Sequence, residues 1–146
     1  MLKALISTSI VTASLLITAC TTTPNSDQQA QNLALLQNKN WELTYIGATE
    51  FKTNPNARNN PSIQFGSDLR VSGSDGCNRL MGQYAIKGQH ITLGQLGATN
   101  MFCQNTMQLA GQYTEALNKV KGYQVYDKTL KLLDQYGNRV LEYKIQ

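Results

Sequence analysis

The sequence has little of the chemistry that enzymes use. It contains a single histidine, His90, and its nine acidic residues are scattered singly along the chain. Covalent catalysis requires a nucleophile beside a base, and hydrolysis of glycosidic bonds requires two carboxylates across a cleft. Neither set can be assembled from the spacing of these residues, so we expect no enzyme activity, no cofactor and no catalytic metal ion.

Charge of either sign is also scarce, because only 15% of the residues are Asp, Glu, Lys or Arg. From Lys119 onward the basic residues are interleaved with Asp127, Asp134 and Glu142 rather than forming an uninterrupted run. A nucleic-acid groove needs a denser basic face with aromatic side chains directed into it. We therefore expect ordinary solvated strand faces in this region and no nucleic-acid partner.

The apolar run near the amino terminus is too short to span a bilayer. It extends from Ala4 to Ile17, after Lys3, whereas a transmembrane helix needs roughly 20 apolar residues. Its length and position are typical of a signal peptide, residues 1–19. The sequence Ile17-Thr18-Ala19-Cys20 resembles the bacterial lipobox, in which the cysteine is lipidated and becomes the new amino terminus. The alternative is an ordinary secretory leader that is cut after Ala19.

The lipobox resemblance implies a membrane location. It implies a diacylglyceryl thioether on Cys20 and an amide-linked acyl chain such as palmitate, and two or more acyl chains anchor a protein stably. Thr21 stands where aspartate typically retains a lipoprotein at the inner membrane, which favours the outer membrane and its periplasmic face. Residues 20–39 begin with a stretch rich in Thr, Ser, Asn and Gln, and we expect a flexible tether. From Gln28 to Lys39, the segment around Leu33, Leu35 and Leu36 would also suit a short helix packed on the domain.

Two cysteines remain, Cys77 and Cys103, and an even pair in an oxidising compartment forms a disulfide by default. In an alternative interpretation they would bind zinc together with His90, but zinc sites usually contain closely spaced pairs such as Cys-x-x-Cys, and none is present. The same lack of a Cys-x-x-Cys motif argues against a redox-active pair.

A glycine-rich turn at residues 73–84 organises the rest of the chain. Asp75-Gly76 is a strong turn dipeptide because both residues tolerate positive φ, and apolar alternation on each side predicts two antiparallel strands. Asn78 and Arg79 are the candidate site residues of this stretch. We expect structural roles for them, with Asn78 satisfying backbone groups of the turn and Arg79 covering the sheet edge.

Other segments predict more antiparallel strands and one helix. Trp41, Leu43 and Tyr45 alternate with polar residues, and Trp41 is expected to pack in the core rather than to hold a ligand. Beyond the second cysteine the apolar period changes to three and four, which predicts an amphipathic helix over residues 104–119. Strands, one helix and then strands predict an α+β domain over residues 40–146. We expect a curved antiparallel β-sheet, a barrel-like half shell, packed on one α-helix.

These motifs, taken in order, resemble the META domain of HslJ-like bacterial proteins. The resemblance rests on Gly76-Cys77-Asn78-Arg79, on Gly82-x-Tyr84 and on Met101-Phe102-Cys103, and it covers about Asn40 to Gln146. Phe102 departs from the Met-Ala-Cys usual at the second cysteine. The resemblance implies a small β-rich half shell with a helix and no established enzymatic activity. It also implies an association with heat or envelope stress and a fold similar to some secretion-system pilotins.

Three functions follow as hypotheses. The first is a non-enzymatic, monomeric, lipid-anchored envelope protein that supports outer-membrane homeostasis or a stress response through a protein or lipid contact. The second is a carrier that holds an apolar or lipid ligand in the cupped sheet. The third is a pilotin-like chaperone of a secretion-system subunit. A barrel interior filled by side chains would count against the carrier, and a long exposed apolar groove would favour the carrier or the chaperone.

Overall fold

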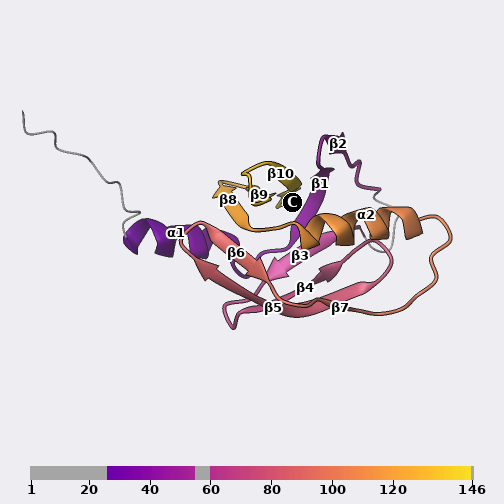
Figure 1. The fold of residues 1–146 in the computed structure, drawn as a ribbon, viewed down its shortest axis with the longest axis horizontal. Coiled ribbons are helices and arrows are strands. Elements are labelled where there is room, and N and C mark those ends of the chain that lie inside the picture. The colour runs from indigo at the N-terminus through magenta and orange to yellow at the C-terminus, as the bar shows by residue number, and fades with distance from the viewer. Residues whose placement is uncertain (1–25, 55–59, 146) are drawn as a thin grey trace, which may run out of the picture.

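The computed structural model describes residues 26–54 and 60–145, so the expected signal peptide and Cys20 lie outside the described part of the chain. This part contains two helices and ten strands (Figure 1). The helices are α1 (Ser26–Leu36) and α2 (Met107–Asn118). The strands are β1 (Trp41–Ile46), β2 (Thr49–Glu50), β3 (Ser62–Phe65), β4 (Arg70–Ser74), β5 (Arg79–Lys87), β6 (His90–Leu93), β7 (Gly97–Ala98), β8 (Gly122–Tyr126), β9 (Thr129–Leu133) and β10 (Arg139–Lys144).

The antiparallel sheet closes on itself. Its order is β1, β3, β4, β5, β6, β8, β9, β10, and β10 pairs again with β1, while β2 and β7 are short additions beside β1 and β5. The prediction of an α+β domain with a curved antiparallel sheet is therefore confirmed. The half shell becomes a closed barrel because the first and last strands pair, with Glu42 opposite Lys144. Alternation within each strand does not encode a contact between two segments so far apart in the chain.

The seam between β1 and β10 is fastened by Arg139. Its guanidinium bonds to the Glu142 carboxylate at 2.6 Å (Nη1 to Oε2) and donates to the backbone carbonyl of Gly47 at 3.0 Å. It also lies 4.5 Å from the centre of the Tyr45 ring, within the range of a cation–π contact. Glu142 is buried. One side chain thus links the turn after β1 to β10, and this link supports the closure.

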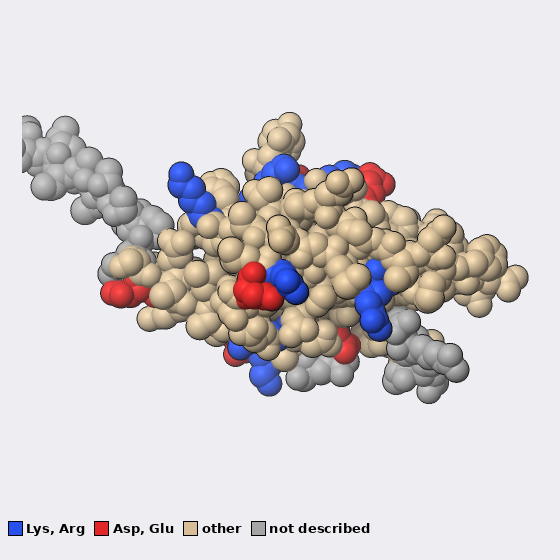
Figure 2. Space-filling view, turned by 90° about the horizontal axis from the view of Figure 1, so that it is seen from below, with Lys and Arg blue, Asp and Glu red and all other residues tan. Residues whose placement is uncertain are grey.

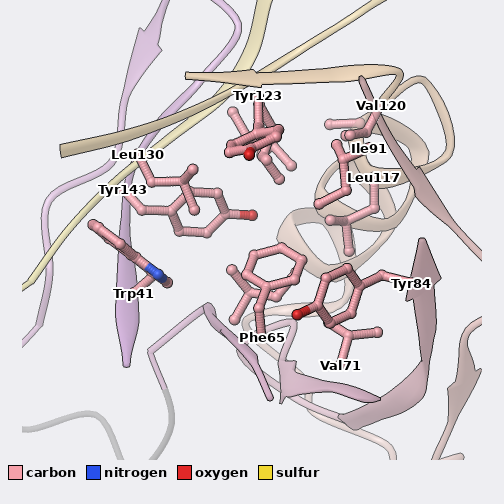
Figure 3. Packing of buried hydrophobic residues seen from close by; sticks show 14 of the residues in the cluster. Trp41, Phe65, Val71, Tyr84, Ile91, Leu117, Val120, Tyr123, Leu130 and Tyr143 are labelled. Carbon is pink, nitrogen blue, oxygen red and sulfur yellow. The ribbon is translucent and has the colours of Figure 1, made fainter. Parts of the chain in front are cut away.

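The barrel interior is filled by side chains, many of them aromatic (Figure 3). The ring of Phe65 meets that of Tyr84 edge to face at 5.1 Å between centroids, and Tyr113 meets Tyr143 in the same manner at 6.4 Å. The Tyr143 hydroxyl donates to the Tyr113 hydroxyl at 3.0 Å, and the Tyr113 hydroxyl donates to the carbonyl of Ser62 at 3.3 Å. Burial raises the pKa of both tyrosines above their ordinary range. This interior is a packed core and not a channel.

Helix α2 covers the barrel and contributes to this core. Its buried residues recur at intervals of three and four, and the helix contacts β1 and β10. It begins at Met107, three residues later than predicted. Residues 104–106 form a turn instead, in which the N–H of Thr106 donates to the carbonyl of Cys103 at 3.1 Å. The Cys103 disulfide fixes the chain just before this turn.

Helix α1 changes the expected picture of the tether over residues 20–39. This segment is helical from Ser26 to Leu36, and Leu36 is fully buried in the core. The indole N–H of Trp41 donates to the carbonyl of Leu36 at 2.9 Å, and Gln37 donates to the Tyr84 hydroxyl at 2.7 Å. The packed part of the chain therefore begins before residue 40, because the burial of Leu36 in the core outweighs the polar composition around it. Among the described residues, none of the helices has the length and apolar character that crossing a membrane requires.

Candidate functional site

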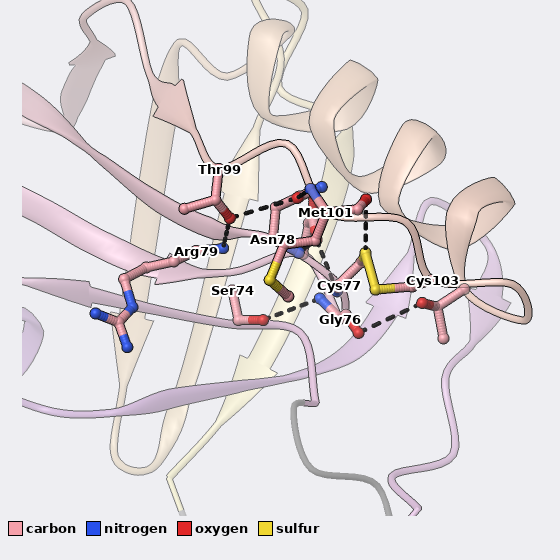
Figure 4. Close-up of a disulfide and its surroundings, with 10 residues drawn as sticks. Ser74, Gly76, Cys77, Asn78, Arg79, Thr99, Met101 and Cys103 are labelled. Atoms are coloured by element: carbon pink, nitrogen blue, oxygen red, sulfur yellow. Dashed lines mark hydrogen bonds between the residues drawn. A yellow bond between two sulfur atoms is a disulfide. The ribbon is translucent and has the colours of Figure 1, made fainter.

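The Cys77–Cys103 disulfide joins the turn between β4 and β5 to the segment that leads into α2 (Figure 4). The Cα atoms of the two cysteines lie 5.8 Å apart. We call the two joined segments, residues 74–79 and 99–106, the disulfide tip. His90 lies on β6 and is not part of it. The described residues contain no cluster of His, Cys, Asp or Glu that could hold a metal ion, so the zinc interpretation finds no support in the geometry.

Asp75 holds the turn of the disulfide tip from inside. Its side chain is buried, and Oδ1 accepts hydrogen bonds from the backbone N–H groups of Cys77, at 2.8 Å, and of Asn78. Its Oδ2 accepts from the side-chain amide of Asn78 at 3.2 Å. Gly76 has a φ of +93°, which a side chain would strain, so glycine suits this position. The sequence identified Asp75 only as a turn former. Its role as the acceptor of three hydrogen bonds could have been suspected from Asn78, three residues later, whose amide is one of the donors.

Asn78 connects the two halves of the disulfide tip. Its side-chain oxygen accepts from the backbone N–H of Met101 at 2.8 Å and lies 3.4 Å from the Thr99 hydroxyl (Figure 4). The Thr99 hydroxyl in turn accepts from the backbone N–H of Arg79 at 3.0 Å. The Asn78 side chain therefore satisfies one backbone group, the N–H of Met101, and ties it to the Asp75 carboxylate. The backbone N–H groups of the turn, which we expected Asn78 to satisfy, are bonded to Asp75 instead.

Arg79 and Trp41 lie in different surroundings. The Arg79 side chain is exposed, and it has no side-chain partner within the part of the chain that the structure describes. It lines a hollow of about 390 Å³ together with Met81 and Met101. Trp41 is fully buried in the core, with its indole N–H bonded to α1. Of the residues singled out from the sequence, the structure brings Gly76, Asn78, Arg79 and both cysteines together, and it places Trp41 elsewhere.

Sequence reasoning missed a group of exposed apolar side chains on and beside the disulfide tip. Phe102 is 83% exposed and Met81 is 58% exposed, while Met101 and Met107 are each about half exposed. Strand and helix periodicity predicts which residues face the core, but it does not predict that large apolar residues will gather outside it. The departure at Phe102 from the usual family pattern was the available signal.

A second concavity lies between the β1–β2 hairpin and α2. It has a volume of about 310 Å³, and its apolar lining includes Phe51 and Leu109. Glu115 and Lys119 lie at this groove and are joined by a hydrogen bond of 2.7 Å. That bond, together with the Lys119 charge, lowers the pKa of Glu115. Both side chains are exposed, so the groove is open to solvent.

The fold and the disulfide tip define a small α+β barrel that is stapled by one disulfide and has a filled interior. The chain matches the META domain over residues 34–145 and belongs to the META family. The identification made from the sequence motifs is thus confirmed, with a boundary six residues earlier than residue 40. The match includes the end of α1, in agreement with the burial of Leu36. The META family is not known for an enzymatic activity.

Solved structures provide further comparisons. A protein solved by NMR is 25% identical, with a TM-score of 0.60 over 77% of this chain and 92% of the other. A protein from Burkholderia xenovorans, also solved by NMR, is 27% identical, with a TM-score of 0.61. The match covers 80% of this chain and 87% of the other. A DUF4847 family protein from Bacteroides vulgatus ATCC 8482 is 15% identical, with a TM-score of 0.57 over 77% and 95%, and shares the fold alone. No curated protein matches the chain.

Proposed function

We propose that this protein is a non-catalytic lipoprotein of the bacterial envelope. In this proposal Cys20 anchors it to the outer membrane on the periplasmic side, and it supports envelope homeostasis under stress by contacting another protein. One observation carries the proposal. The barrel interior is filled by side chains, while large apolar side chains are exposed at the disulfide tip. A domain built in this way is suited to act through its surface rather than through an internal site.

The anchor is tested with the full chain and a Cys20→Ser variant, grown with an alkyne analogue of palmitate. The full chain is expected to carry the label and to fractionate with the outer membrane, because several acyl chains hold a protein stably. The variant is expected to lose the label and to leave the membrane fraction. An unlabelled full chain whose mass corresponds to cleavage after Ala19 would contradict the anchor and support the ordinary secretory leader.

The role in stress is tested in a strain that lacks the protein. We expect poorer growth after heat shock and greater leakage of periplasmic markers, and both defects should be corrected by the full chain. The Cys20→Ser variant should correct them poorly, because in this proposal the protein acts at the membrane. Equal recovery with the full chain and with the Cys20→Ser variant would show that the stress role does not depend on the lipid anchor.

A carrier is the second candidate, because the groove between the β1–β2 hairpin and α2 is partly apolar. Its volume of about 310 Å³ lies at the lower end of small-molecule sites. Native mass spectrometry of the protein purified from the envelope decides between the two. A co-purifying apolar adduct that is lost in Leu109→Asp would favour the carrier. A bare oxidised chain would favour the surface contact.

A further inference from the structure

We propose that the disulfide tip is a docking surface for a periplasmic protein that presents an apolar side chain next to a carboxylate. This inference deepens the proposed function by naming the surface and the chemistry of the partner. The orientation of the domain at the membrane rests on the lipid anchor of that function. The exposed side chains and the charges of the tip do not depend on the anchor.

The exposure of side chains on and directly beside the disulfide tip is unusual for the residue types involved. Methionine is among the residues most often buried, yet Met81, Met101 and Met107 are each about half exposed, and these are all the methionines of the described part. Phe102, the chain neighbour of Met101, is 83% exposed. Flexible thioether side chains adapt to the surface of a partner, and gathered apolar side chains mark interaction sites. The tip therefore offers an adaptable apolar surface.

The charges around the tip indicate what the partner carries. No charged residue occurs in the sequence between His90 and Glu115, and the end of the molecule that bears segment 99–106 is uncharged in the view of Figure 2. Arg79 is the cation that lines the hollow of about 390 Å³ with Met81 and Met101. A free guanidinium pairs well with a carboxylate, often through two parallel hydrogen bonds. An apolar side chain flanked by a carboxylate complements this hollow.

The position of the anchor favours a protein over a lipid surface as the occupant. Residues 21–25 separate Cys20 from the start of α1 at Ser26, and the six Cα–Cα steps between these two residues reach at most about 20 Å. Helix α1 lies at one end of the molecule, and segment 99–106 lies at the opposite end (Figure 1). The carboxyl end of α1 is fixed to the core by the buried Leu36. A lipidated Cys20 would hold the α1 end near the bilayer and direct the disulfide tip into the periplasm.

The tip is also held in shape before binding. The disulfide, the buried Asp75 and the Asn78 amide fix segments 74–79 and 99–106 against each other. A surface that is already ordered loses less conformational entropy on binding, which increases affinity.

The test uses the full processed chain in nanodiscs of phosphatidylethanolamine and phosphatidylglycerol, and the probe is a display library of random linear peptides. We expect enrichment of peptides that combine a large apolar residue with Asp, Glu or a free carboxyl terminus. Phe102→Ser and Met101→Ser should each weaken their binding about tenfold. Arg79→Gln should weaken it and remove its dependence on salt. Tyr136→Ser, an equally exposed aromatic at the β9–β10 turn, is the matched control and should change nothing.

Several results would overturn the proposal. These are a selection without enriched peptides, or enriched peptides whose binding is unaffected by Phe102→Ser. Two other results would name another occupant: sedimentation of Cys20→Ser protein with vesicles of the same lipids that depends on Phe102, and concentration-dependent dimers that depend on it. Whether Cys20 is lipidated is measured separately, from the intact mass of the processed chain. Peptide binding by an unlipidated chain would therefore uphold the surface while refuting the anchor.

Discussion

Two turns of this domain contain a similar arrangement of an aspartate and an asparagine, around the buried Asp75 in one turn and the half-buried Asp134 in the other. In the β4–β5 turn, Asp75 accepts two backbone N–H groups and the amide of Asn78. In the β9–β10 turn, Asp134 accepts from the backbone of Tyr136 at 2.8 Å and of Asn138 at 2.9 Å, and from the Asn138 amide at 3.1 Å. The two turns therefore allow a comparison of similar hydrogen bonds around a buried and a half-buried aspartate.

We expect Asp75→Asn to lower the free energy of unfolding by about 1–3 kcal/mol, because a new amide would face the Asn78 amide where water cannot replace the lost acceptor. Asp134→Asn should cost less than about 1 kcal/mol, because that turn is exposed to water. Urea unfolding of both variants measures the difference. Equal losses would show that burial of Asp75 is not what makes its contacts matter.

The elements divide into those that local pattern predicts and those that distant contacts create. Alternation predicted β1 from Trp41, and the change of period predicted α2 within three residues at each end. Closure by β10 and β1 was missed because it depends on pairing across the chain. Likewise, β7 was missed because two residues, Gly97 and Ala98, carry no alternation. At the tip, the turn could be predicted from Asp-Gly, whereas the exposure of Phe102 could not.

Helix α1 gives a direct test of where the domain begins. Leu36 is fully buried, whereas its neighbour Leu35 is exposed. Leu36→Ala should cost about 2–5 kcal/mol of unfolding free energy, the usual effect of removing a buried leucine side chain. Leu35→Ala should change it by less than about 1 kcal/mol. If both variants behaved alike, α1 would be a tether resting on the barrel rather than part of the core.

The disulfide is expected to stabilise the barrel by restricting the unfolded chain. It closes a loop of 26 residues, which the chain-entropy model converts to about 3.5 kcal/mol. A double Cys77→Ala, Cys103→Ala variant should therefore lose roughly 2–4 kcal/mol in urea unfolding without reductant. Reductant should destabilise the natural chain by a similar amount and leave the variant unaffected. A variant as stable as the oxidised chain would show that the hydrogen bonds of Asp75 and Asn78 suffice to hold the tip.

The whole barrel should respond to alkaline pH through its buried tyrosine pair. Burial raises the pKa of Tyr113 and Tyr143 above the usual value near 10, so the folded state keeps protons that the unfolded chain releases above that pH. Their stabilising effect is fully present below about pH 10 and is lost as the pH rises toward the folded pKa. Each tyrosine should contribute a slope of about 1.4 kcal/mol per pH unit.

Unfolding free energies measured in urea between neutral pH and strongly alkaline pH test this slope. The double variant Tyr113→Phe, Tyr143→Phe should flatten it by about 3 kcal/mol per pH unit, twice the value for one tyrosine. The Tyr136→Phe variant is the control and should leave the slope unchanged, since that side chain lies on the surface and outside the core. Tyr84 and Tyr123, whose pKa values burial also raises, should maintain the remaining slope. A slope that survives unaltered in the double variant would show that the alkaline sensitivity of the barrel does not come from the Tyr113–Tyr143 pair.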